Sequence, residues 1–188
     1  MREIQKMRFK VLVIGDNHVG KTSLLRKFTQ GRFEKDYVKT LGAEFSKYDK
    51  EIDGFAIRLI FWHIAGGKEF LYLRSTLVSN TNAAIIMYSL EDCEEGRESF
   101  SHIAFWYNYV FDYTEDIPMY LFANKVDLVE ENSINKVDIE QVVEEYNLQG
   151  YYFTSAVTGG DVMKAFDDIS LELYKKAKEK QKQENGRN

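Results

Sequence analysis

The chain has 188 residues and a formal net charge of −5, and 44% of its residues are hydrophobic. These values fit one globular domain and exclude a disordered chain. They also argue against a broad nucleic-acid surface, which would be basic, and Cys93 as the only cysteine excludes an internal disulfide.

Apolar runs alternate with stretches of helical periodicity, which predicts a parallel sheet covered on both faces. The strands are expected at 9–14, 55–62, 83–88, 119–123 and 151–153, and the helices near 22–30, 69–79, 96–113, 138–147 and 161–182. Residues 44–50 alternate in polarity, so we expect them to pair with 55–62 around Asp53-Gly54 as an antiparallel edge strand. The fold class is therefore α/β, with three αβα layers, a six-stranded mixed sheet and five helices.

Residues 15–22 read G-D-N-H-V-G-K-T, the pattern of a phosphate-binding loop. The loop lies between a buried strand and a helix, so backbone N–H groups and the helix dipole point at one place, which attracts phosphate. Lys21 can reach the outer phosphates and Thr22 can ligate Mg²⁺. For His18, a solvent-facing position and a phosphate contact both remain open. The residues expected to bind phosphate are Asn17, His18, Val19, Gly20, Lys21, Thr22 and Ser23.

A second motif, Asn124-Lys125-Val126-Asp127, directly follows the apolar run 119–123. This places it at the carboxyl end of a strand, where open α/β sheets bind ligands. Its carboxylate can accept hydrogen bonds from N1–H and the 2-amino group of guanine, and adenine lacks that amino group. The alternative is an ordinary Asn-Lys turn with a solvated Asp. After the last short strand, a backbone N–H can reach the guanine oxygen, and the residues expected there are Ser155, Ala156 and Val157.

Phe33 and Thr40 follow Lys21 by twelve and nineteen residues. With the two motifs, they resemble the Ras superfamily of small GTPases over residues 9–175, flanked by an N-terminal extension at 1–8 and by the end of the last helix with a polar tail at 176–188. The stretch T-L-G-A-E-F at 40–45 and Phe61-Trp62 resemble Rab proteins.

The resemblance implies the G-domain of a P-loop NTPase that binds GTP or GDP with Mg²⁺. It implies that Phe33 packs on the guanine edge, and that Thr40 joins Thr22 at the Mg²⁺ when GTP is bound. Gly66 matches the third motif of the family and is expected among the nucleotide-binding residues.

That third motif reads D-T-A-G-Q-E in the family and His63-Ile64-Ala65-Gly66-Gly67-Lys68 here. His63 replaces the aspartate that helps to hold Mg²⁺, so we expect Mg²⁺ to be held weakly. Gly67 replaces the glutamine that orients the attacking water, so we expect very slow hydrolysis and assign no catalytic residue.

Rab proteins bind effectors and regulators through their switch regions, and the resemblance places the corresponding surface at Phe45, Trp62 and Leu77. The alternative is that Phe45 and Trp62 are simply half-buried between strands. The chain ends E-N-G-R-N, so we expect no lipid anchor in it. Either it is soluble, or it is one domain of a longer chain with a second G-domain. A cytoplasmic protein recruited to membranes by partners is expected.

The function that the sequence supports is a Rab-like guanine-nucleotide switch with impaired hydrolysis, in vesicle trafficking or signalling. The alternative is a pseudo-GTPase scaffold that holds nucleotide permanently or not at all. An ATP-dependent P-loop enzyme is a third reading, which the N-K-x-D motif disfavours.

Overall fold

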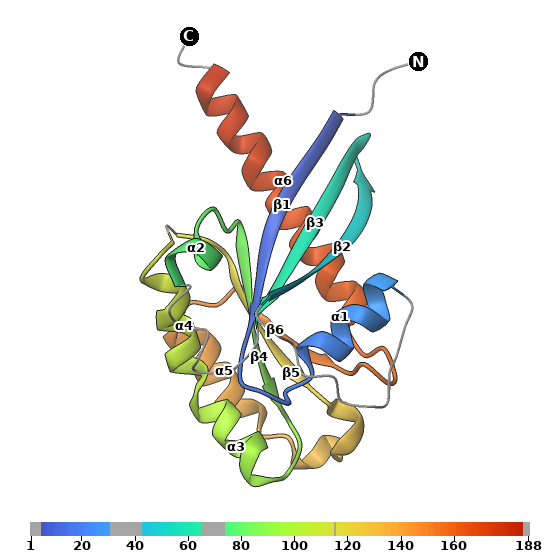
Figure 1. Ribbon diagram of the computed structural model, residues 1–188, viewed down its shortest axis with the longest axis vertical. Coiled ribbons are helices and arrows are strands. Elements are labelled where there is room, and N and C mark those ends of the chain that lie inside the picture. Colours follow the sequence, from blue (N-terminus) through green and yellow to red (C-terminus); the bar gives the residue numbers. More distant parts are fainter. Residues whose placement is uncertain (1–4, 31–42, 65–73, 115, 186–188) are drawn as a thin grey trace.

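A computed structural model describes residues 5–30, 43–64, 74–114 and 116–185 (Figure 1). The strands are β1 Gln5–Ile14, β2 Ala43–Ile52, β3 Phe55–Ile64, β4 Ala83–Ser89, β5 Met119–Asn124 and β6 Tyr151–Thr154. The helices are α1 Lys21–Gln30, α2 Arg74–Val78, α3 Glu94–Ser101, α4 Ile103–Phe111, α5 Lys136–Glu145 and α6 Val162–Asn185. Two 3-10 turns, η2 Val126–Leu128 and η3 Glu131–Ser133, lie between β5 and α5.

The six strands form one sheet in the order β2-β3-β1-β4-β5-β6. Only the β2–β3 pair is antiparallel, and its hairpin turns at Asp53 and Gly54, which both have positive φ. A two-residue turn with positive φ at both central residues has a backbone twist that matches the right-handed twist of the flanking strands. The mixed sheet with an antiparallel edge strand is therefore confirmed, as is the expected α/β class.

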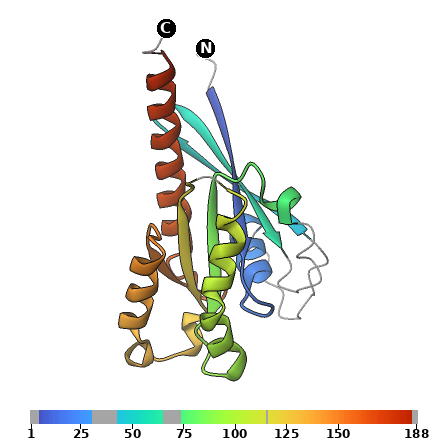
Figure 2. The ribbon, with the colours of Figure 1, turned by 90° about the vertical axis from the view of Figure 1, so that its left-hand side faces the viewer.

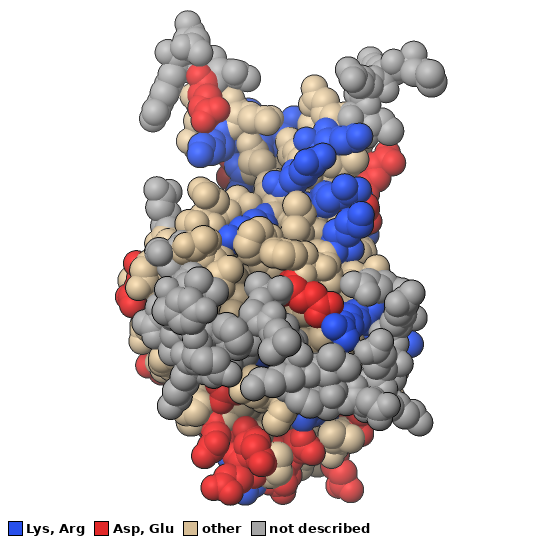
Figure 3. Space-filling view, in the orientation of Figure 1, with Lys and Arg blue, Asp and Glu red and all other residues tan. Residues whose placement is uncertain are grey.

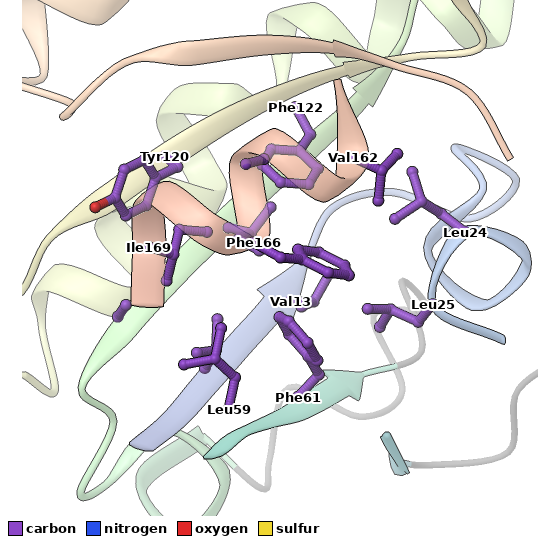
Figure 4. Close-up of a cluster of buried hydrophobic side chains, with 14 of the residues drawn as sticks. Val13, Leu24, Leu25, Leu59, Phe61, Tyr120, Phe122, Val162, Phe166 and Ile169 are labelled. Carbon is purple, nitrogen blue, oxygen red and sulfur yellow. The ribbon is translucent and has the colours of Figure 1, made fainter. Parts of the chain in front are cut away.

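Helices cover both faces of the sheet and enclose two cores. On one face, α1 and α6 pack against the sheet through Leu24, Leu25 and Phe166, which meet Val13 and Phe61 from the strands (Figure 4). On the other face, α2, α4 and α5 supply the second core. Figure 2 shows α6 along one side of the sheet and α4 along the other. None of the described helices is both long enough and apolar enough to cross a membrane.

Some boundaries differ from those that the sequence suggested. β1 begins at Gln5, because Gln5–Arg8 pair with Phe55–Arg58 of β3 although their apolar content is low. The helix expected at 96–113 is divided at His102, whose ψ of 1° departs from helical geometry. The last helix continues to Asn185 rather than ending near 182.

Candidate functional site

The loop between β1 and α1 contains glycines that no other residue could replace without strain. Gly15 has φ of 139°, and a Cβ there would lie 2.0 Å from the carbonyl oxygen of Met87 in β4. Gly20 has φ of 97°, and a Cβ there would lie 2.3 Å from Nδ2 of Asn124. Both glycines thus let the backbone approach β4 and β5 closely.

Lys21 begins α1, and its side chain turns back into the loop. Its Nζ donates to the carbonyl oxygens of Gly15, at 2.8 Å, and Asp16, at 2.6 Å. Burial lowers the pKa of Lys21 to about 7, and the negative charge of Asp16 opposes this shift. An anion bound in the loop would favour the charged form, because an opposite charge nearby raises the pKa of an ammonium.

The remaining loop residues divide into exposed and buried ones. Asn17, His18 and Ser23 are exposed, and Val19 is buried. His18 has φ of 64°. Asn17 and His18 line a hollow of about 260 Å³ together with Lys125 from the second motif. The structure therefore brings the phosphate loop and the N-K-x-D motif together at one edge of the sheet.

Asn124 connects the two motifs directly. Its Nδ2 donates to the carbonyl oxygen of Val19 at 2.7 Å, and its Oδ1 accepts from Oγ1 of Thr154 at 3.0 Å. Both Asn124 and Thr154 are buried. Asn124 therefore positions the loop and β6 relative to β5, and Thr154 is a positioning residue that the sequence pattern did not identify.

Lys125 and Asp127 lie at the surface after β5. Lys125 has φ of 66°, and its Nζ contacts Oε2 of Glu91 at 2.6 Å. Asp127 lies in η2 and is exposed. Among the described residues, none forms a hydrogen bond with its carboxylate. The carboxylate is thus available to a ligand.

The segment after β6 forms a tight turn. Oγ of Ser155 accepts from the backbone N–H groups of Val157 and Thr158, both at 3.0 Å. Ser155 is fully buried, and Ala156 packs against the core shared with α1 and α6, whereas Val157 is exposed. The hydroxyl of Ser155 therefore fixes the turn that the sequence predicts to contact the base.

His63 lies at the end of β3, between the phosphate loop and β2. Its Nδ1 is 3.4 Å from Oγ1 of Thr22, and its Nε2 is 3.8 Å from Oε2 of Glu44. Two hydrogen bonds from Arg26 hold that carboxylate, at 3.0 and 2.9 Å. Burial lowers the pKa of His63 to about 4, although the negative charge of Glu44 opposes this. The imidazole is therefore neutral near pH 7.

Asp16 ties the phosphate loop to the beginning of α4. Its Oδ2 lies 2.6 Å from Nδ1 of His102, and its Oδ1 accepts from Nε1 of Trp106 at 2.7 Å. This link was not predictable from local sequence, because the partners of Asp16 are 86 and 90 residues away.

The Ras family model matches residues 10–175. The chain belongs to the Ras family. It is 32% identical to Ras-related protein Rab-26 of Homo sapiens over 171 residues, which are 90% of this chain and 65% of that protein. It is also 32% identical to Ras-related protein Rab-1 of Theileria parva over 170 residues, which are 89% of this chain and 75% of that protein. This Ras-family chain is therefore a divergent Rab-like member, and it spans about 65% of the length of the Rab-26 relative.

Several residues that the family resemblance assigns to the nucleotide lie outside the described part of this Rab-like chain. They are Phe33, Thr40 and Gly66. Gly67 also lies there. Their roles remain predictions from the sequence.

The expected partner surface of the Rab-like chain needs one correction. Phe45 is 53% exposed and packs edge-on against Trp62, with 4.5 Å between ring centroids. Leu77 is only 9% exposed and belongs to the core under α2. The Nζ of Lys10 donates to the Leu77 carbonyl oxygen at 2.8 Å and holds that end of α2 against β1. Leu77 is thus a core residue, and of the expected surface Phe45 is exposed whereas Trp62 is half-buried.

Proposed function

We propose that this chain is a guanine-nucleotide-binding Rab-like switch with very slow GTP hydrolysis, acting in vesicle trafficking or signalling. The observation that carries this proposal is the hydrogen bond from Asn124 to the Val19 carbonyl, which joins the phosphate loop to the base motif. Lys21 and the backbone of 15–22 would hold the phosphates, and Asp127 with the turn after β6 would hold guanine. We also propose that the protein acts in the cytoplasm and reaches membranes through partners.

The residues around Thr22 fit a tightly held Mg²⁺ poorly. Mg²⁺ prefers oxygen ligands and is held in related P-loop proteins by a Ser or Thr hydroxyl and an aspartate. Here the hydroxyl of Thr22 is present, but its neighbour is the neutral imidazole of His63. The Glu44 carboxylate lies on the far side of that ring and is bound by Arg26. We therefore propose that nucleotide affinity depends little on Mg²⁺.

Restoring the carboxylate tests this proposal. We expect EDTA to change the release rate of fluorescent mant-GDP little in the unmodified protein. In His63→Asp, we expect EDTA to accelerate release by on the order of tenfold or more, because the new carboxylate strengthens the contribution of Mg²⁺. His63→Asn is the matched control, since it shortens the side chain without adding charge. Strong EDTA sensitivity of the unmodified protein would contradict the proposal.

Hydrolysis is expected to be barely detectable. A small GTPase that has its glutamine hydrolyses GTP on the order of 10⁻⁴ s⁻¹ without an activating protein, and Gly67 has no side chain to orient water. Single-turnover measurement should give a slower rate, and Gly67→Gln alone should restore little because His63 remains. A rate equal to that of glutamine-bearing relatives would show that another residue positions the water.

The second candidate is a scaffold that holds nucleotide permanently or not at all. The neutral, fully buried His63 beside Thr22 favours it, because this imidazole replaces the aspartate that helps to hold Mg²⁺ in the family motif. Chromatography of the nucleotides released by boiling the purified protein separates the two functions. Absence of guanine nucleotide, together with no binding of GDP or GTP with or without Mg²⁺, would leave only the scaffold.

A further inference from the structure

The face of β1, β3 and β2 that points away from α6 carries a group of basic side chains. Met7, Phe9 and Leu59 point into the core with α6, so the alternate residues of these strands lie on the opposite face. Lys and Arg gather over the upper parts of these strands, while Asp and Glu gather at the opposite end of the molecule (Figure 3). We call the basic residues the basic sheet face: Lys6, Arg8, Lys10, Lys47 and Arg58.

The charges of the basic sheet face are incompletely neutralised. Arg8 lies directly opposite Arg58 in the strand register, and like charges in this position destabilise a sheet. Asp49 binds Arg58 through two hydrogen bonds, at 2.5 and 2.8 Å. Within the described ranges, Lys6, Arg8 and Lys47 are exposed and form no ion pair. In a chain whose net charge is −5, this concentration of positive charge is local.

The same face is hollowed rather than flat. One groove of about 330 Å³ is lined by Arg8, Phe45, Lys47 and Arg58 among others, and a second, of about 320 Å³, shares Arg8 and Arg58 with it. Residues that share a face recur about every 6.6 Å along a strand. The distance along the strands from the level of Lys6 to the level of Phe45 is therefore roughly 20 Å. That length matches a helix of about 13 residues.

The end of the basic sheet face next to Phe45 is apolar. The exposed Phe45 ring packs against Trp62, and Lys10 Nζ lies 4.2 Å from the centre of the Trp62 ring on the same face. A partner bound along the grooves would therefore contact positive charge over most of its length and an aromatic surface at one end.

We propose that the basic sheet face binds an acidic helical segment of another protein, with an apolar residue of that segment on Phe45. The acidic side chains of Asp49 and Glu51 interrupt the positive charge, so a partner with spaced charges fits better than a uniformly anionic lipid surface. The face belongs to the strands rather than to residues 31–42 or 65–73. The basic side chains belong to β1, β2 and β3, so we expect binding there to be independent of the bound nucleotide, and the basic sheet face extends the expected partner surface at Phe45 along the strands.

The test uses the full chain and a fluorescein-labelled peptide of about 14 residues, built from Glu and Ala with a terminal Leu, which forms a helix of about the required length. Fluorescence anisotropy should show salt-sensitive binding that is equal with GDP and with a GTP analogue. The double variant Arg8→Glu/Lys47→Glu should bind at least about tenfold more weakly, because each reversal removes an attraction and adds a repulsion. Phe45→Ala should weaken binding by a few fold.

The matched control is Lys175→Glu/Lys180→Glu, which makes the same charge change on exposed positions of α6. It should bind the peptide like the unmodified chain. Equal loss in both double variants would overturn the proposal, because net charge alone would then explain binding. Binding of phosphatidylserine vesicles but not of the peptide would overturn it in favour of a membrane, and binding in only one nucleotide state would assign the surface to the switches. Mant-GDP binding by the same variants should be unchanged, which separates this proposal from the nucleotide site.

Discussion

Asp127→Ala is expected to abolish measurable GTP binding. The carboxylate is exposed, free of hydrogen bonds to the described residues and placed in η2 directly after β5. Alanine leaves N1–H and the 2-amino group of guanine without an acceptor. Sites built around such hydrogen bonds discriminate by roughly 10⁴–10⁵-fold, so a loss of this order is expected in mant-GTP titration.

Two further variants make this result specific. Glu130→Ala removes an exposed carboxylate from the same loop and should leave affinity unchanged. Asp127→Asn exchanges an acceptor for an amide that can donate, so it should favour xanthine, which carries an oxygen in place of the 2-amino group. Unchanged GTP affinity of Asp127→Ala would show that guanine is not read here.

Gly15→Ala is expected to have the largest effect on stability. The new Cβ would lie 2.0 Å from the Met87 carbonyl oxygen, and φ at Gly15 is 139°. Because backbone lies on both sides of this contact, relief requires a shift of the loop or of β4. We expect a loss of at least about 3 kcal/mol in the free energy of unfolding, and a fall of roughly 10 °C in the melting temperature.

Gly150→Ala is the matched control for this substitution. Gly150 also has strongly positive φ, at 156°, but a Cβ there would meet no atom within 4 Å. The backbone strain alone should cost about 1–2 kcal/mol. Thermal unfolding of both variants therefore separates strain from steric overlap. Equal losses would contradict the close packing of the phosphate loop on β4.

The local features of this fold were predictable because neighbouring residues specify them. The glycine loop at 15–22 lies between an unbroken apolar strand and an amphipathic helix, and Asp53-Gly54 is a typical hairpin turn. The start of β1 at Gln5 was not predictable in this way, because the polar side chains Lys6 and Arg8 lie on a face that α6 does not cover.

The contacts that assemble the site depend on the folded topology and were not predictable from local pattern. The hydrogen bond between Asn124 and Val19 joins residues 105 positions apart. The sequence placed Asn124 in the motif expected to read the base, but it could not show that the Asn124 amide is bonded to the loop and to Thr154. In the same way, the sequence showed that His63 replaces a carboxylate of the family motif. It could not show that the His63 imidazole is buried between Thr22 and Glu44.

Competition for labelled GDP is the most direct measurement of the central claim, which is that the loop at 15–22 and the motif at 124–127 form one guanine-nucleotide pocket. We expect unlabelled GTP to displace mant-GDP and ATP to fail even at roughly 10⁴-fold higher concentration, because adenine offers no amino group to Asp127. Displacement by ATP at the same concentration as GTP, or no binding of mant-GDP at all, would contradict it.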